Sequence, residues 1–457
     1  MKLTPPLLAY LCTCAPTHAQ ERQLTFDAGG HILTNTAAWS GDSQWLFYDV
    51  RSMPETFDGD RINRVNVQTG TMEMVYHAPG GSACGVITCH PHDPIVVFIQ
   101  GPETPDDAWS YGASRRRGVT VDLRLTGDQR VRPLDAANYA PPFTTGALRG
   151  GSHVHVFSGD GQWVSFTYED ELLTRPAPGV VNPVPNQRNI GVSIPAGPVS
   201  VNNRHPRNHN GDWFSVLVTC TVARPRRGSD DINLALEEGW IGLNGYVRAD
   251  GSRQAKALAF QGRVTALDGR EHREVFIVDL PEDLTQAGER PLCGTITDMP
   301  FPPKGVRQRR LTFTDDRVPR GIQGPRHWLR SSPDGSSIAF LMRDKAGVVQ
   351  CWLVSPLGGA PRQLTHIAER PGIASAFTWS PDGITLAAVV DDRVCLIDAS
   401  NGQIRALTPP HIKTEAPLDL ACVFSPDGRS IAFQRKILSP DGTTHPQIFV
   451  VSLSSKP

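Results

Sequence analysis

A four-residue phrase recurs along this chain and limits the folds open to it. It reads Ser-Pro-Asp-Gly at residues 332–335, 380–383 and 425–428, and a short apolar stretch follows each copy. Pro presets its own φ, Asp bonds back to the backbone and Gly accepts a positive φ, so the chain reverses tightly between two strands. Looser copies stand at residues 39–42, 90–93 and 158–161. The copies fall mostly about 40 to 50 residues apart, the length of one four-stranded blade, which predicts an all-β repeat protein.

A second phrase closes each predicted blade. Arg-x-Leu-Thr stands at residues 309–312, 362–365 and 405–408, each time after a strand-like run. The same phrase occurs at residues 22–25, where it has no blade of its own. We expect this early copy to supply the outer strand of the last blade, which joins the two ends of the chain and removes an exposed sheet edge.

The fold predicted for residues 20–457 is a single β-propeller of about seven four-stranded blades, with eight or six as the alternatives. The count depends on how residues 196–312 are divided. Residues 210–213 (Asn-Gly-Asp-Trp) resemble another blade start, whereas residues 229–234 predict a short capped helix in an insertion around residues 223–245. Residues 246–251 match the turn phrase in phase, so the repeat is expected to resume there.

The first 19 residues differ from the rest of the chain. Lys2 precedes a short apolar run at residues 7–11, and Thr17-His18-Ala19 offers a small-residue cleavage site. This outline predicts a signal peptide over residues 1–19 and therefore a periplasmic protein. The alternative is a cytoplasmic protein with an irregular N-terminus.

Composition excludes several classes of partner. The formal net charge is −1, and no aromatic-basic strand pattern is present, so nucleic acid is not an expected ligand. No apolar run reaches the length that spans a bilayer. The nine cysteines include no Cys-x-x-Cys pair, and seven would remain after cleavage at Ala19, so neither a cysteine zinc site nor a complete disulfide framework is expected.

Together the two phrases resemble the WD40-like repeats of TolB-type propellers. Residues 22–121, with Thr34-Asn35, Gly101-Pro102-Glu103 and residues 116–119 (Arg-Arg-Gly-Val), resemble an uncharacterised bacterial family typified by YidR, as do residues 238–242 (Glu-Gly-Trp-Ile-Gly). The TolB resemblance implies a binding or scaffold role toward a protein or glycan partner in the periplasm. The YidR resemblance implies no particular activity.

The histidines are the strongest candidates for a site, because the G-x-S-x-G, H-E-x-x-H, P-loop and G-x-G-x-x-G strings are all absent. Five residues before each turn serine, the innermost strand should begin at one mouth of the central channel. That position holds His153 in one blade and His327 in another. His155 follows at a spacing of two, which on a strand points to the same face, and His205 falls where His155 does if a blade starts at Trp213. Such a cluster would suit a divalent transition metal such as manganese.

The His-x-His before a repeat turn also resembles the metal site of oligogalacturonate lyases, which are seven-bladed relatives. In that family the histidines share manganese with a glutamine just upstream. Here Gly150 stands three residues before His153, at the place where the resemblance puts that ligand.

Two functions therefore remain open from the sequence. The first is a TolB-like propeller that binds a protein or glycan partner. The second is a metal-dependent enzyme, a lyase or hydrolase acting on an acidic oligosaccharide, with imidazoles on the metal and arginine on the substrate carboxylate. Basic runs that offer such an arginine stand at residues 115–117, 224–227 and 307–310. The sequence names neither the ligand nor the oligomeric state.

Overall fold

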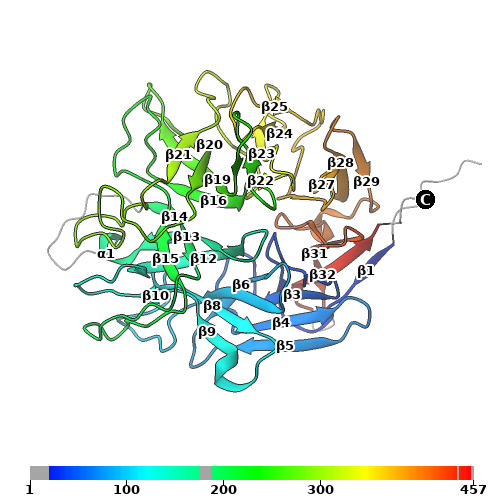
Figure 1. Ribbon diagram of the computed structural model, residues 1–457. Coiled ribbons are helices and arrows are strands. Elements are labelled where there is room, and N and C mark those ends of the chain that lie inside the picture. The colour runs from blue at the N-terminus through cyan, green and yellow to red at the C-terminus, as the bar shows by residue number, and fades with distance from the viewer. Residues whose placement is uncertain (1–19, 175–186, 440–441, 454–457) are drawn as a thin grey trace, which may run out of the picture.

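The computed structural model describes residues 20–174, 187–439 and 442–453. They form seven four-stranded antiparallel sheets arranged around a common centre (Figure 1), which confirms the predicted seven-bladed propeller. Within these ranges, helical structure is limited to α1 (Glu171–Thr174) and the 3-10 turns η1 (Ala113–Arg115), η2 (Gly127–Arg130) and η3 (Lys413–Glu415). No helix in these ranges has the length and apolar character that a membrane span needs.

Each blade is named here by its place in the chain, with its strands from the centre outward. Blade 1 contains β2 (His31–Ile32), β3 (Trp45–Val50), β4 (Arg61–Asn66) and β5 (Met72–His77). Blade 2 contains β6 (Cys84–Cys89), β7 (Ile95–Gln100), β8 (Arg117–Asp122) and β9 (Val131–Pro133). Blade 3 contains β12 (Gly150–Phe157), β13 (Val164–Asp170), β14 (Arg188–Ile194) and β15 (Phe214–Leu217). Blade 4 contains β16 (Ala235–Trp240), β19 (Lys256–Thr265), β20 (Glu271–Leu280) and β21 (Arg307–Arg310).

The remaining three blades carry the clearest copies of the turn phrase. Blade 5 contains β22 (Arg330–Ser331), β23 (Ile338–Arg343), β24 (Val349–Val354) and β25 (Arg362–Gln363). Blade 6 contains β26 (Thr378–Trp379), β27 (Thr385–Val390), β28 (Arg393–Asp398) and β29 (Ile404–Ala406). Blade 7 contains β30 (Val423–Phe424), β31 (Ser430–Leu438), β32 (Thr444–Ser452) and β1 (Glu21–Gln23). Two small extra sheets pair β10 (Ala136–Ala137) with β11 (Ala147–Leu148) and β17 (Tyr246–Val247) with β18 (Arg253–Gln254).

The N-terminal strand closes the ring as predicted. β1 pairs antiparallel with β32, with Arg22 opposite Val450, and Figure 1 shows the two ends of the described chain side by side in this blade. The backbone N–H of Leu24 continues the ladder by donating to Ile448 O at 2.8 Å. One sheet therefore contains both ends of the described chain, and β1 covers the outer edge of β32.

The turn phrase works through short local hydrogen bonds. In blade 5 the Ser332 hydroxyl donates to Asp334 Oδ1 at 2.5 Å, and the same oxygen accepts the N–H of Ser336 at 3.0 Å. Gly335 has a φ of +77°, which an L side chain rarely adopts. The phrase therefore joins the innermost strand of a blade to its second strand.

The threonine of the closing phrase forms hydrogen bonds that hold the outermost strand of a blade to its third strand. In blade 5 Thr365 Oγ1 accepts the N–H of Cys351 at 2.9 Å and donates to Gln350 Oε1 at 2.8 Å, and Gln350 Oε1 also accepts the N–H of Ile367 at 3.0 Å. The same threonine-to-third-strand arrangement recurs elsewhere: Thr219 with Asn189 in blade 3, Thr312 with Glu274 in blade 4, and Thr25 with Gln447 in blade 7. We call this arrangement the threonine pin.

The core lies between neighbouring blades. A phenylalanine on the second strand is at most 2% exposed in six blades: Phe47, Phe98, Phe166, Phe260, Phe340 and Phe433. Burial of one such ring contributes about 1.5–3 kcal/mol. The apolar strands that follow each turn phrase are thus packed on both faces, as their sequences suggest.

Two details between residues 196 and 312 differ from the sequence prediction. Residues 210–213 do not start a blade, because they precede β15, the outermost strand of blade 3. Trp213 and the preceding His209 instead bridge to Asp135 and Ala137 in the chain before blade 3. Residues 229–234 do not form a helix. They make a turn, in which Ser229 and Asp231 bond to Arg226, and then enter β16.

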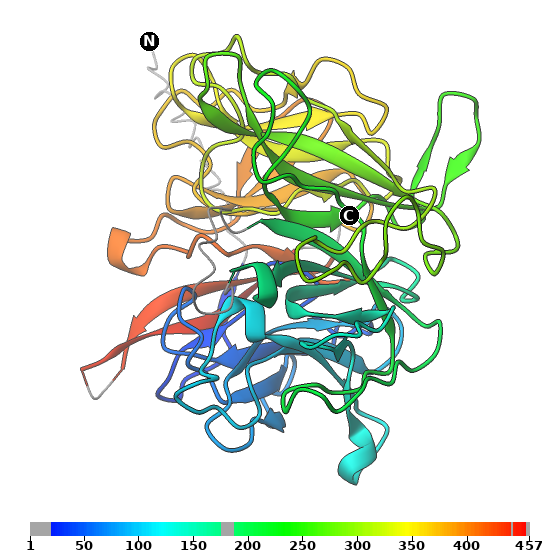
Figure 2. The same ribbon diagram turned by 90° about the vertical axis from the view of Figure 1, so that its left-hand side faces the viewer.

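The hairpin β17–β18 occupies the connection in blade 4 where other blades have the tight turn. It stands away from the ring as the green hairpin in Figure 2. Residues 250–251 therefore lie between the innermost and the second strand of blade 4, as the repeat predicted, but at the tip of a longer hairpin.

Candidate ligand-binding cavity at the channel mouth

A cavity of about 570 Å³ opens where the inner strands of several blades meet. Side chains from blades 1 to 4, from the segment leading into blade 5 and from Leu420 before blade 7 form its wall. No lining residue comes from blade 6, so the cavity is built mainly by one side of the ring. A concave site with a few converging polar groups is the usual form of a small-ligand site.

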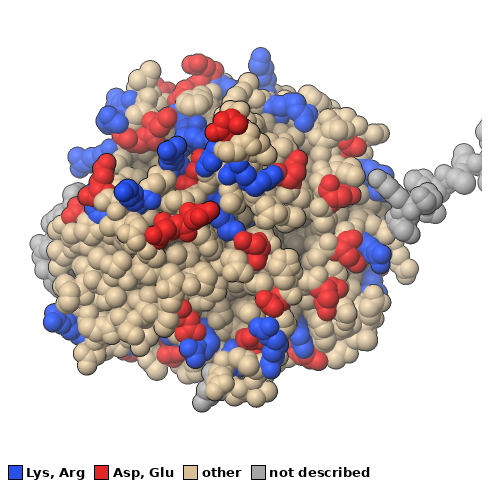
Figure 3. Space-filling model, in the orientation of Figure 1, with Lys and Arg blue, Asp and Glu red and all other residues tan. Residues whose placement is uncertain are grey.

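Positive charge dominates this cavity. Five arginines line it against two glutamates: Arg51, Arg116, Arg188, Arg273 and Arg326, with Glu55 and Glu237. The surface of the face seen in Figure 3 carries both signs interspersed, with few charges over β10 and β15. With a whole-chain charge of −1, the basic character is a local property of the cavity, and it favours an anionic ligand.

Three of the five arginines are held by carboxylates. Arg51 pairs with Asp49, Arg188 Nε lies 2.7 Å from Glu169 Oε1, and Arg326 Nε lies 3.0 Å from Glu237 Oε1. These pairs orient the guanidinium groups and reduce the charge that each one offers to a ligand.

Arg116 and Arg273 differ, because neither has a carboxylate within 4.0 Å in the described part of the chain. Arg116 Nε donates to the Tyr111 hydroxyl at 2.7 Å, and its guanidinium lies near the rings of Tyr111 and Phe57. Arg273 donates to Gln261 Oε1 at 3.2 Å. Partial burial lowers the pKa of Arg273. Two pre-oriented guanidinium groups are therefore available for an anion.

His153 and His327 both line this cavity, where the repeat frame placed them. Burial, with Arg116 next in importance, holds the pKa of His153 well below its usual value, so its imidazole is neutral. Its Nδ1 is buried without a hydrogen-bond partner among the described residues. His153 is thus a neutral polar group set among arginines.

His327 has no nitrogen left for a metal. Its Nδ1 donates to Pro325 O at 2.9 Å and its Nε2 accepts the N–H of Leu341 at 3.1 Å. Burial lowers its pKa to about 4. In blade 6 the hydroxyl of Ser375 accepts the N–H of Val389 at 2.8 Å in the equivalent place, so His327 fills a position that the repeat uses to bind backbone.

His155 does not share the face of His153, contrary to the prediction. A β-bulge separates His153 from Val156, and Val154 has a φ of +56°, which breaks the period of two. His155 is fully buried between blades 2 and 3, where its Nε2 donates to Ser152 Oγ at 3.0 Å and Ser152 donates to Asp135. The serine lies between acid and imidazole and is sealed from solvent, so this chain of bonds is not a nucleophilic triad.

His205 lies outside the cavity. It belongs to the loop before β15, and its ring is 5.5 Å from the ring of Trp109 and 5.5 Å from that of Tyr139. The blade frame that placed it near His155 began at Trp213, which is not a blade start. The four predicted histidines therefore do not converge.

The cavity also contains strained backbone that no sequence motif marks. Val86, Val154 and Glu237 have φ values of 58°, 56° and 58°, and all three line the cavity from the innermost strands of blades 2, 3 and 4. A β-branched residue with positive φ is a genuine outlier. Strain of this kind gathers at binding sites, where the fold holds it in place.

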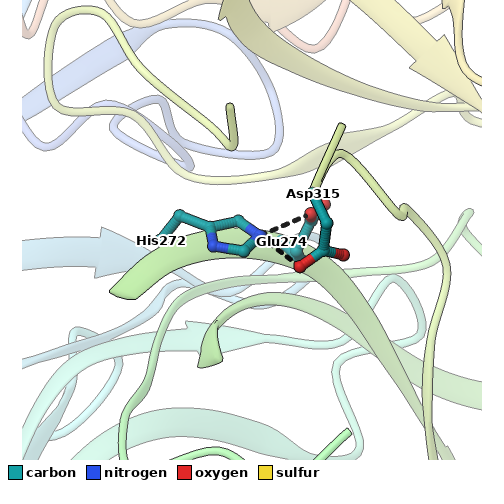
Figure 4. A group of neighbouring side chains, drawn as sticks. All are labelled: His272, Glu274 and Asp315. Atoms are coloured by element: carbon teal, nitrogen blue, oxygen red, sulfur yellow. Dashed lines mark hydrogen bonds and ion pairs between the residues drawn. The ribbon is translucent and has the colours of Figure 1, made fainter. Parts of the chain in front are cut away.

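A separate group of possible metal ligands consists of His272, Glu274 and Asp315, whose ligand atoms lie within 4.8 Å of one another (Figure 4). Glu274 Oε1 already accepts the N–H of Thr314 at 2.8 Å and lies 3.0 Å from both His272 Nε2 and Arg310 Nη2. Glu274 is also the acidic member of the threonine pin, at a position where blades 5 and 7 have glutamine. The guanidinium of Arg310, 2.7 Å from Asp315, neutralises this cluster, which fits a charged variant of the pin better than a cation site.

The residues present therefore fit a manganese-type site poorly. His327 has both nitrogens occupied, His155 and His205 face elsewhere, and the Glu274 cluster contains its own cation. A guanidinium-rich cavity is instead suited to carboxylate or phosphate groups.

Fold and cavity together define a seven-bladed propeller with a basic cavity at one mouth of its channel. The chain is 46% identical over 416 residues to the uncharacterized protein YidR of Escherichia coli (strain K12), covering 90% of this chain and 94% of YidR. It belongs to the YidR family. Residues 83–209 also match the family described as protein of unknown function (DUF3748).

The chain is also similar to two solved structures. An oligogalacturonate lyase in complex with manganese overlaps 96% of this chain and 95% of its own length, with a TM-score of 0.54 and 13% identity. TolB from Acinetobacter baumannii overlaps 90% of this chain and 80% of its own, with a TM-score of 0.34 and 14% identity. At 13% identity the likeness to the lyase concerns the fold alone.

Of the three basic runs in the sequence, residues 115–117 reach the cavity, through Arg116. Arg226 pairs with Asp231 at the surface, and Arg310 belongs to the threonine pin of blade 4. Arg273 and Glu237 stand in no motif, and sequence reasoning missed both. Glu237 lies on the innermost strand of blade 4 and Arg273 near the beginning of its third strand, and no residue pattern marks either position.

Proposed function

We propose that this protein is a binding propeller whose cavity holds the carboxylate of an acidic saccharide, as part of a glycan partner in the cell envelope. The observation that carries the proposal is the pair Arg116 and Arg273, which lack a carboxylate partner within the described residues and face one cavity from blades 2 and 4. The neutral imidazole of His153 adds a hydrogen-bonding group that carries no charge of its own.

The test is calorimetric titration of the mature protein with short oligogalacturonates and with neutral oligosaccharides of the same length. Only the acidic series should bind, and binding should weaken as salt rises. Arg116→Ala and Arg273→Ala should each weaken binding about ten- to a hundredfold, the effect of losing one charge-assisted hydrogen bond. Arg226→Ala is the matched control, because Arg226 forms an exposed pair with Asp231 away from the cavity. Equal binding of neutral saccharides, or unchanged affinity in both cavity variants, would refute the proposal.

A second candidate is a metal-dependent lyase or hydrolase acting on an acidic oligosaccharide. It is favoured by the manganese named with the lyase structure and by the close approach of His272, Glu274 and Asp315. Those three residues would have to hold the metal, because the histidines of the cavity do not converge. Elemental analysis of purified protein separates the candidates: near-stoichiometric manganese that is lost in Asp315→Ala supports the enzyme, and metal-free protein that binds oligogalacturonate supports the binding role.

A further inference from the structure

We propose that the basic cavity is closed at its inner end and therefore receives the terminal unit of an acidic glycan. This inference rests on the proposed function, because it says which part of that ligand enters. Its basis is a contact across the ring: Arg330 Nη2 in blade 5 donates to Asn35 O at 3.2 Å and to Asn35 Oδ1 at 3.3 Å in blade 1.

This contact crosses the central channel. Blades 6 and 7 separate blade 5 from blade 1 on one side of the ring, and blades 2, 3 and 4 separate them on the other. In a ring of seven no two blades lie further apart, so a side chain that joins them must span the opening between the innermost strands. Burial lowers the pKa of Arg330 to about 10, so the guanidinium is still charged at neutral pH and the contact is charge-assisted.

The wall of the cavity ends at the level of this contact. Asn35 lines the cavity, whereas Arg330 does not. On the innermost strands of blades 2, 3 and 4 the last wall residues are Val86, Val154 and Glu237, and each of these strands continues for three residues toward the turn face without contributing to the wall. The cavity therefore occupies one end of the channel and does not pass through the ring.

Further hydrogen bonds hold this floor in place. Asn35 is buried, and its Nδ2 donates to Ala421 O at 3.1 Å in the segment that leads into blade 7. The backbone oxygen of Arg330 accepts the indole N–H of Trp379, in blade 6, at 3.0 Å. The floor thus joins blades 1, 5, 6 and 7. A polymer that threaded the channel would have to break the contact between Arg330 and Asn35, whereas a ligand that enters from the mouth leaves it intact.

A blind cavity suits a chain end better than an internal unit. An internal unit of a linear glycan continues on both sides and needs a groove that is open at two ends, whereas a terminal unit continues on one side only. The volume of about 570 Å³ lies within the usual range of small-ligand sites. In the cavity wall, the buried Nδ1 of His153 lacks a hydrogen-bond partner among the described residues, so it is available to a hydroxyl of the terminal unit.

The number of proteins bound per glycan chain tests the inference. The full-length mature protein is titrated by calorimetry with trigalacturonate and with polygalacturonate that is long enough to hold many copies of the protein. A linear chain has only two ends, so at most two proteins should bind to one chain, however long the chain is. A number that grows with chain length would overturn the inference and leave the proposed function standing. No binding of either ligand would refute the proposed function, and this inference with it.

Leu420 offers a variant at the inner end, because its side chain lines the cavity and its backbone oxygen accepts Asn35 Nδ2 at 3.4 Å. Leu420→Phe adds bulk where the terminal unit would lie, so it should weaken trigalacturonate binding roughly tenfold or more through a steric clash. Ile384→Phe is the matched control, since Ile384 is exposed in the turn between β26 and β27 and should leave the affinity unchanged. Melting temperatures show whether both variants fold. Unchanged affinity in folded Leu420→Phe would overturn the inference, and the count of proteins per chain decides it without any variant.

Discussion

His327 Nε2 accepts a hydrogen bond from the backbone N–H of Leu341 at 3.1 Å, so this imidazole stabilises blade 5. A buried backbone N–H that loses its acceptor costs about 1–3 kcal/mol. We therefore expect His327→Ala to lower the free energy of unfolding by about that amount, measured by chemical denaturation, and to leave the metal content of the purified protein unchanged. Loss of a bound metal in this variant would instead make His327 a ligand.

Ring closure through β1 should stabilise the whole propeller. Residues 20–27 supply the outer strand of blade 7 and the Thr25 hydroxyl, which donates to Gln447 Oε1 at 2.6 Å. Deleting these residues should lower the melting temperature in a single cooperative transition, because blade 7 loses its outermost strand. Thr25→Val keeps the strand and removes the pin, so its smaller loss of about 1–3 kcal/mol serves as the control. A truncated protein that melts at the parent temperature would show that closure contributes nothing.

The acidic threonine pin of blade 4 gives a test of charge pairing. Glu274→Gln reproduces the residue found in blades 5 and 7 but removes the buried carboxylate partner of Arg310, which keeps the more exposed Asp315 at 2.7 Å and Asp230 at 3.7 Å. Hydrogen bonds from His272, Thr312 and Thr314, together with Arg310, outweigh burial and hold the pKa of Glu274 below its usual value. Breaking such a pair should cost roughly 3 kcal/mol or more of unfolding free energy. Arg310→Met together with Glu274→Gln should recover much of this loss, whereas an equally unstable double variant would show that the ion pair is not the cause.

Glu238 should make stability depend on pH near neutrality. Burial raises the pKa of Glu238 to about 7, with Thr167 donating to its Oε2 at 2.8 Å. Between the ordinary pKa of a glutamate and 7 the folded state holds a proton that the unfolded state has lost. The contribution of Glu238 to stability is therefore fully present below about pH 4.3 and is lost as the pH rises through 7.

The check is Glu238→Gln, which cannot ionise. It should unfold with a free energy close to the parent at pH 4.5 and exceed the parent by roughly 2–4 kcal/mol at pH 8. Asp135, whose pKa burial raises to about 6, is present in both proteins and cancels in the difference. A difference that does not change with pH would remove Glu238 as the source.

Residues 1–19 lie outside the described residues, and their role stays a prediction. We expect the mature protein isolated from native cells to begin at Gln20 and to fractionate with the periplasm, because Thr17-His18-Ala19 ends the predicted signal peptide. Mass spectrometry of the N-terminus decides this. An intact N-terminus in the cytosolic fraction would contradict it.

The sequence by itself determined the repeat, the seven blades and the closing strand. Their signals are local: Ser332, Asp334 and Gly335 complete a turn within four residues, and Arg22 to Thr25 repeat a phrase that needs a third strand to pair with. Because these hydrogen bonds join near neighbours in the chain, the residue types at those positions identify such turns without a structure.

Only the tertiary structure decided which side chains meet at the channel. The period of two predicted that His155 lies beside His153, but the positive φ of Val154 turns the His155 side chain between the blades. A valine in the sequence gives no signal that a bulge occurs there. Arg116 and Arg273 reach one cavity from blades 2 and 4, more than 150 residues apart. Side-chain direction at a bulge and the approach of separate blades depend on packing across the whole ring, which no local pattern encodes.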